Sequence, residues 1–210
     1  MNPSQLETRK IFLMYRRPLC KTEKVIQFVS NCGEFTHCEV YCPDLDEDGF
    51  VGWTFTNFSM CKMMKTRRCI PSYIAECDKY TFHSIDLTRN QFSRFVEWNR
   101  LQVLNKCSYN YKDLPLQMLP KTLARSTVND LNTTQATTPK KLFCSQAVIL
   151  ALRHALEPTH RVSLALAHIN TRLSTPTMVA TSLESLYGKP RDVCLLMKII
   201  SHGMTRHKIT

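Results

Sequence analysis

One cysteine in this sequence, Cys144, lies where a thiol could act as a nucleophile. It follows Lys140-Lys141-Leu142-Phe143 and opens an apolar stretch that predicts a helix over 142–156. The free N–H groups and partial positive charge of a helix N-terminus favour the thiolate, and the two lysines add positive potential. Backbone N–H groups around Ser145 could also stabilise an oxyanion. A buried cysteine that only packs is the alternative interpretation.

A histidine and a carboxylate on one predicted strand could supply a base and the group that orients it. The segment Phe35 to Cys42 is typical of a strand, in which alternate side chains face the same way. His37 and Glu39 therefore share a face, where the carboxylate could orient the imidazole as a general base. Taken alone, the pattern is more typical of a histidine without a chemical role.

The same region holds four side chains that could ligate zinc. They are Cys32, His37, Cys38 and Cys42. Structural zinc sites use paired ligands that converge on one tetrahedron, whereas adjacent strand residues such as His37 and Cys38 point to opposite faces. We therefore expect no metal and no other cofactor.

The elements that would position these residues follow a mixed order, which is typical of an α+β fold. Strands are predicted at 11–15, 35–42, 50–58, 80–87 and 193–200. Helices are predicted at 22–31, 88–107, 142–156 and 180–187. The second and third strands should form a β-hairpin around a polar turn, and Thr88 with Gln91 forms a capping box before the longest helix. We expect an antiparallel sheet packed against helices.

The length of the chain indicates one domain. With 210 residues, one compact domain is the default, and its core needs no disulfide or metal. We expect a single domain over 1–210 with its core at about 11–200. A long polar loop at 124–139 and a basic tail at 201–210 complete this prediction.

The ten cysteines are expected to be mostly free thiols. The first ten residues lack the apolar segment of a signal peptide. No stretch approaches the ~20 apolar residues of a membrane span, so no transmembrane segment is predicted. These features favour a reducing compartment, with an intracellular, cytoplasmic location rather than secretion.

The net charge of +11 could attract an acidic partner. The basic residues are scattered, and the longest run is only Lys65-Thr66-Arg67-Arg68. A nucleic-acid-binding patch would need aromatic residues among its charges, and these basic runs contain few of them. We therefore expect a solvated basic surface and no nucleic-acid partner.

The motifs together carry a resemblance to a known family. Thr36-His37-x-Glu39 lies on an early strand, and Phe143-Cys144-Ser145-Gln146 opens a helix far downstream. Tyr109-Asn110-Tyr111 lies between them, and Ser182-Leu183-x-x-Leu186-Tyr187 lies near the end. The pattern resembles the circularly permuted NlpC-type branch of the papain-like cysteine peptidases and amidases, found in viruses and bacteria, of which lecithin:retinol acyltransferase is a distant relative. The resemblance implies a papain-like fold in which Cys144 is the nucleophile and His37 its base. A viral source would imply the host cytoplasm or the virion.

The sequence leaves two candidates for the third catalytic residue. The family commonly places a polar residue on the strand that follows the histidine, often a carboxylate, His, Asn or Gln, whereas this sequence offers threonines there. If the hairpin turned about Asp46, His37 would lie opposite the Thr54–Thr56 region. Glu39 and Thr54 are therefore alternatives for this role.

Two functions of different class follow from these observations. The first is a cysteine-dependent hydrolase or acyltransferase that cleaves an amide or ester bond, in a peptide or another substrate, through an acyl-enzyme. The second is a catalytically inactive viral accessory or virion interaction protein that uses its basic surface. The enzyme requires the Cys144 sulfur within ~5 Å of a ring nitrogen of His37, and we expect that pair in a cleft open to solvent.

Overall fold

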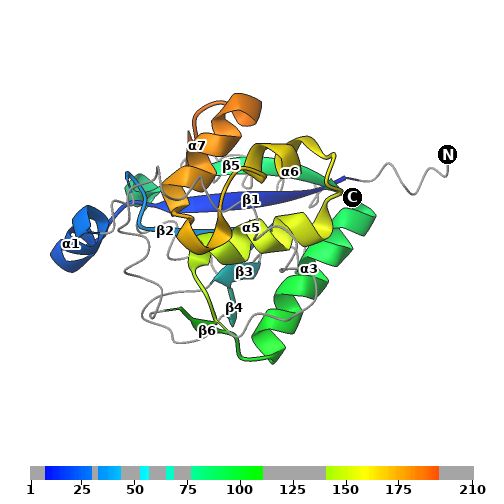
Figure 1. Ribbon diagram of the computed structural model, residues 1–210, viewed down its shortest axis with the longest axis horizontal. Coiled ribbons are helices and arrows are strands. Elements are labelled where there is room, and N and C mark those ends of the chain that lie inside the picture. Colours follow the sequence, from blue (N-terminus) through cyan, green and yellow to red (C-terminus); the bar gives the residue numbers. More distant parts are fainter. Residues whose placement is uncertain are drawn as a thin grey trace, which may run out of the picture.

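A six-stranded antiparallel sheet forms the centre of the protein, as the computed structural model shows (Figure 1). The structure describes residues 8–29, 33–43, 53–56, 65–68, 77–110 and 141–193. The strands of the sheet are β1 (Thr8–Arg16), β2 (His37–Cys42), β3 (Trp53–Thr56), β4 (Lys65–Arg68), β5 (Tyr80–Thr88) and β8 (Arg191–Asp192). Their order is β4-β3-β2-β1-β5-β8, and each neighbouring pair is antiparallel.

Helices cover one face of this sheet. They are α3 (Arg89–Leu104), α5 (Cys144–Ala155), α6 (Arg161–Leu166) and α7 (Pro176–Tyr187). Two short 3-10 turns, η3 (Cys77–Lys79) and η6 (Thr171–Leu173), precede β5 and α7. A separate parallel pair, β6 (Ser108–Tyr109) and β7 (Lys141–Leu142), leads into α5. The α+β class and the antiparallel sheet packed against helices are therefore confirmed.

Side-chain alternation along the central strand β1 divides the core. Ile11, Leu13 and Tyr15 face the helices, together with Cys38 and Val40 of β2. A smaller apolar cluster on the opposite face contains Phe12, Met14, Tyr41, Tyr80, Phe82 and Val193. The sheet therefore buries side chains on both faces, and the larger core lies between the sheet and the helices.

Helix α5 is the centre of the larger core. Every residue from Cys144 to Leu152 is buried, because the helix packs on β2 and is covered by α3, α6 and α7. At its far end, Arg153 donates hydrogen bonds to the carbonyls of Leu166 (2.9 Å) and Ile169 (3.2 Å). These bonds fix the C-terminal end of α5 against α6 and the residues that follow it.

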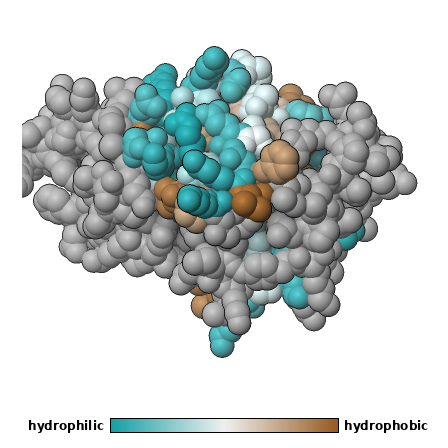
Figure 2. Space-filling view, turned by 90° about the vertical axis from the view of Figure 1, so that its left-hand side faces the viewer, coloured by the Kyte–Doolittle hydropathy of each residue, from teal (hydrophilic) through white to brown (hydrophobic). Residues whose placement is uncertain are grey.

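Helix α1 (Lys21–Val29) projects from the left end of the sheet, away from the other helices (Figure 1). Figure 2 looks at that end of the molecule, where the coloured surface is mostly hydrophilic with a few hydrophobic residues. On this helix Val25 and Phe28 are 61% and 88% exposed. Its anchor is polar, since Glu23 accepts a hydrogen bond of 2.7 Å from the buried Arg16.

Local sequence signals explain most element boundaries. The Thr88–Gln91 capping box is present, and α3 ends three residues before the predicted Cys107. Helix α7 begins at Pro176 rather than at Ala180, because Thr175 caps it and proline is well suited to the first helical position. The sequence interpretation missed α6 and took β4 only as a basic run.

Several predictions lie wholly or partly outside the described residues. These are the polar turn after β2, the 124–139 loop, the 201–210 tail and most of the predicted strand 193–200. Among the helices that the structure describes, none has the length and apolar character needed to cross a membrane.

Candidate active site

Cys144 is the first residue of α5. The preceding Phe143 is extended (φ −80°, ψ 162°), and its backbone N–H donates to the side-chain oxygen of Gln146 at 3.4 Å. The first N–H groups of a helix have no acceptor within the helix, and they carry the positive end of its dipole. The thiol therefore lies where negative charge is stabilised.

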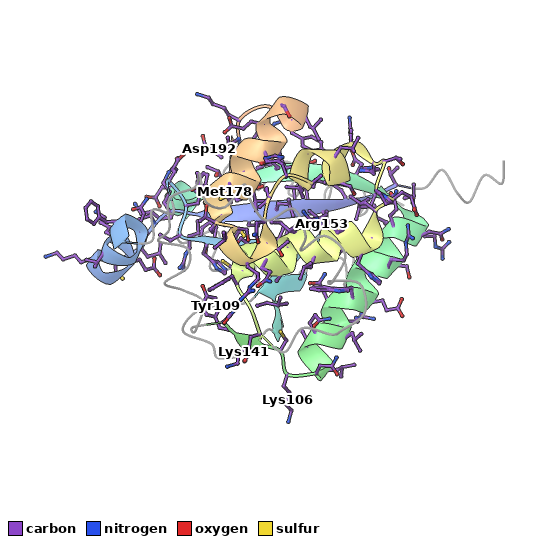
Figure 3. The ribbon with its side chains drawn as sticks, viewed as in Figure 1. Lys106, Tyr109, Lys141, Arg153, Met178 and Asp192 are labelled. Atoms are coloured by element: carbon purple, nitrogen blue, oxygen red, sulfur yellow. The ribbon has the colours of Figure 1, made fainter. Side chains whose placement is uncertain are left out.

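The strand pair β6–β7 and a serine bond hold this helix end in place. The N–H of Asn110 donates to the carbonyl of Leu142 at 3.2 Å, and the Tyr109 ring packs edge-on against Phe143. Figure 3 shows Tyr109 and Lys141 beside each other below the N-terminal end of α5. Inside the first turn, the buried Ser145 hydroxyl donates to the carbonyl of Ser174 at 2.8 Å. The chain on either side of Cys144 is thus bound to neighbouring segments.

His37 is the first residue of β2, and its imidazole lies near enough to the Cys144 side chain for the two groups to shift each other's pKa. The two residues are 107 positions apart in the chain, so the packing of α5 on β2 brings them together. Strand pairing with β1 fixes the backbone of His37 opposite Arg16. The structure therefore joins the two residues that the sequence singled out as nucleophile and base.

The carboxylate next to His37 is that of Glu39. Its Oε2 lies 3.5 Å from Nε2 of the imidazole, and the carboxylate is fully buried. An unpaired buried carboxylate is costly, so the contact with a charged imidazole stabilises both groups. Glu39 is thus placed to orient the ring, as strand alternation predicted.

The other candidate for this role, Thr54, lies elsewhere along the hairpin. The β2–β3 hairpin is confirmed, but its register pairs Tyr41 with Thr54 and Val40 with Phe55. The expectation that His37 lies opposite the Thr54–Thr56 region is wrong, because the register is shifted by three residues from a hairpin centred on Asp46. Strand alternation is a local property, whereas register depends on the length of the turn.

The pKa values of the pair move in opposite directions. Burial lowers the pKa of His37, but hydrogen bonds to Cys144 and Glu39 and the charges of both outweigh it and raise the pKa to about 9. A hydrogen bond from the Cys38 side chain, together with the His37 contact, holds the pKa of Cys144 well below its ordinary value despite burial. These opposite directions favour a thiolate on Cys144 beside an imidazolium on His37.

Cys38 is a site residue that the sequence interpretation missed. Burial and the Cys144 contact raise the pKa of its thiol well above the ordinary value, so Cys38 stays protonated and donates to the Cys144 sulfur. The backbone N–H of Cys38 also hydrogen-bonds Cys144. His37 and Cys38 point to opposite faces of β2, yet both reach one sulfur, because Cys144 lies beside the first residues of the strand. Considered only as a zinc ligand, Cys38 gave no signal of this role in the sequence.

A second buried histidine, His83, shows what a structural histidine looks like in this protein. Its Nε2 lies 2.9 Å from the Gly188 carbonyl, and its Nδ1 lies 3.1 Å from the Tyr15 hydroxyl. Burial lowers the pKa of His83, so the neutral ring donates to the carbonyl and accepts from the hydroxyl. The two buried histidines thus differ in charge at neutral pH, because only His37 contacts a thiolate and a carboxylate.

The site is covered rather than open. Cys144 and His37 are each only 4% exposed, so the expectation of a solvent-open cleft is wrong. A hollow of about 610 Å³ does lie along α3, but its lining residues come from α3 and from Arg9, not from β2 or α5. Entry of anything larger than a small molecule would require neighbouring segments to move.

Comparison with protein-family models, with curated proteins and with solved structures gives no match, so the geometry alone supports an interpretation of the site. Within the described residues, no group of three or more His, Cys, Asp or Glu side chains is arranged to hold a metal ion. Cys32, one of the four residues weighed as zinc ligands, lies outside them.

Proposed function

We propose that the protein is a papain-like cysteine hydrolase or acyltransferase that acts on an amide or ester bond. The observation that carries this proposal is the interacting pair of Cys144, at the start of a helix, and His37, whose ring also contacts Glu39. A nucleophile bonded to a base that a third group orients is the arrangement that covalent catalysis requires. The motifs shared with the circularly permuted NlpC-type branch favour the same proposal.

In the proposed mechanism, the Cys144 thiolate attacks the substrate carbonyl, and the carbonyl π electrons move onto oxygen. Free N–H groups at the start of α5 stabilise this oxyanion. His37 then gives its proton to the leaving amine or alcohol as the tetrahedral intermediate collapses to a thioester on Cys144. Glu39 stabilises the imidazolium until that proton is transferred and keeps the ring oriented afterwards.

The second half of the reaction reverses these roles. His37, now neutral, removes a proton from water or another acceptor, which attacks the thioester and releases Cys144. Water gives hydrolysis and an alcohol or amine gives acyl transfer. The residues at the site perform the same steps in both cases.

An acyl-trapping experiment tests the proposal. After brief exposure to a small activated ester such as p-nitrophenyl acetate, we expect one acetyl group on Cys144, seen by intact mass and peptide mapping. Cys144→Ser should lose this rapid labelling, whereas Cys107→Ala should keep it, because burial raises the pKa of the Cys107 thiol to about 11. Acetylation led by the exposed Cys20 would contradict the proposal and favour the interaction protein.

A further inference from the structure

The active-site cysteine has a second thiol as its direct neighbour. Cys38 and Cys144 come from β2 and α5, are 1% and 4% exposed, and belong to the same packed core. Helix α5 packs directly on β2, and the Cys38 and Cys144 side chains interact closely enough to shift each other's pKa in opposite directions. The proposed acyl transfer uses Cys38 only as a hydrogen-bond donor, and nothing in that reaction requires the donor to be a thiol.

We propose that Cys38 and Cys144 form a redox site, in which hydrogen peroxide converts the pair into a disulfide. In the first step the Cys144 thiolate attacks peroxide, an S–O bond forms as the O–O bond breaks, and hydroxide leaves. The resulting sulfenic acid then reacts with the Cys38 thiol, which forms the S–S bond and releases water. Two thiols are oxidised, one peroxide is reduced, and no other reactant is needed.

The two cysteines are suited to different steps of this sequence. The lowered pKa of Cys144 favours the thiolate, which is the form that attacks peroxide, while the raised pKa of Cys38 favours the protonated thiol beside it. Because both are buried, peroxide is a better oxidant here than a bulky disulfide such as oxidised glutathione. The shared contact means that the second step requires no long movement of the chain.

The other free cysteines in the described ranges are less well placed. Cys42 lies on the same face of β2 as Cys38 but four residues further along the strand, which places it about 13 Å from Cys38. Cys107 is buried, and its thiol points to the Ser108 carbonyl at 3.9 Å. Cys20 is exposed. The chemistry therefore selects Cys38 as the partner of Cys144.

A disulfide at this position would switch the nucleophile off and protect it. The bonded sulfur cannot attack a carbonyl, and a dithiol reductant would restore the thiolate. Without the second thiol, the sulfenic acid would proceed to sulfinic acid, which dithiothreitol does not reduce. The presence of Cys38 would thus make the oxidation of Cys144 reversible.

Peroxide treatment of the full chain, followed by mapping without reduction, tests the inference. We expect a mass loss of two hydrogens, a Cys38–Cys144 cross-linked peptide, and loss of Cys144 alkylation that dithiothreitol reverses. Cys38→Ser and Cys38→Ala should give no such peptide, and with excess peroxide their alkylation loss should become irreversible. Cys107→Ala is the matched control and should behave as the unchanged protein. Circular dichroism checks the fold of each variant.

Three results would overturn the inference. They are a dimedone-trapped sulfenic acid on Cys144 without any cross-link, a disulfide that joins Cys144 to a cysteine other than Cys38, and full recovery of both Cys38 variants after excess peroxide. The test reads bonds by mass and does not use the hydrolase reaction. Its failure would therefore leave the proposed acyl transfer standing, and a failed acyl-trapping experiment would leave the redox site standing.

Discussion

At the scale of single residues, the charge state of Cys144 depends on three neighbours. The Cys38 thiol, the His37 ring and a backbone N–H all hydrogen-bond its sulfur, and together they outweigh the effect of burial on the pKa. Thiolate fraction sets the rate of alkylation. The predictions at this scale therefore concern how the alkylation rate of Cys144 and the protonation of His37 vary with pH.

Replacing His37 should make Cys144 less reactive at mildly acidic pH. His37→Ala removes a positive partner, so the pKa of Cys144 rises, and at a pH below that pKa the thiolate fraction falls about tenfold for each unit of the rise. Iodoacetamide rates measured from about pH 5 to 9 should show the whole profile displaced to higher pH. His154→Ala, at an exposed position of α5, is the matched control. An unchanged profile in His37→Ala would remove His37 from the mechanism.

Replacing Glu39 should lower the pKa of His37 from about 9. Glu39→Gln keeps the shape of the side chain but removes the charge that stabilises the imidazolium. The ring would then lose its proton at lower pH, which an NMR titration of the His37 ring measures directly. Thr54→Ala should leave the titration unchanged, because the register places Thr54 opposite Tyr41. The reverse result would make Thr54 the orienting residue.

At the scale of elements, the entry into β2 depends on a close contact with α7. Gly33 has φ of +76°, and the N–H of Phe35 donates to the Thr177 hydroxyl at 2.9 Å. A Cβ atom at position 33 would come within 2.8 Å of the Thr177 side chain. This contact fixes the segment that leads to His37, and only glycine permits it.

A pair of glycine variants separates the close contact from backbone strain. Gly188 has φ of +73°, but a Cβ there would meet nothing within 4 Å. Both Gly33→Ala and Gly188→Ala should lose about 1–3 kcal/mol to the positive φ, and the Thr177 clash should add about 1 kcal/mol to the loss in Gly33→Ala. Urea unfolding measures both variants. Equal losses would show that Thr177 moves aside without cost.

At the scale of the whole molecule, α5 connects the active site to the core. Leu152 is fully buried two turns from Cys144, whereas Leu164 on α6 is 60% exposed. Leu152→Ala should reduce the free energy of unfolding by about 2–5 kcal/mol through lost contacts and a cavity. Leu164→Ala should change it by less than about 1 kcal/mol. Similar losses in both variants would mean that α5 is not the central support.

The sequence by itself determined the features that depend on local patterns. The Thr88–Gln91 capping box, the β2–β3 hairpin, the sharing of a strand face by His37 and Glu39, and the apolar helix after Cys144 all follow from spacing along the chain. The α+β class follows from the order of these elements. Each signal lies within about twenty residues, where helix and strand periodicity governs the outcome.

Only the tertiary structure decided which distant groups meet. The burial of the site, the displacement of Thr54 from His37, and the contact of Cys38 with Cys144 depend on strand register and on where α5 packs against β2. Alternation alone places Cys38 on the face away from His37, so no local rule brings both to one sulfur. His37 and Cys38 both reach Cys144 because the N-terminal end of α5 lies beside the first residues of β2. Side-chain packing between these two elements, which are more than a hundred residues apart in the chain, sets the position of that helix end.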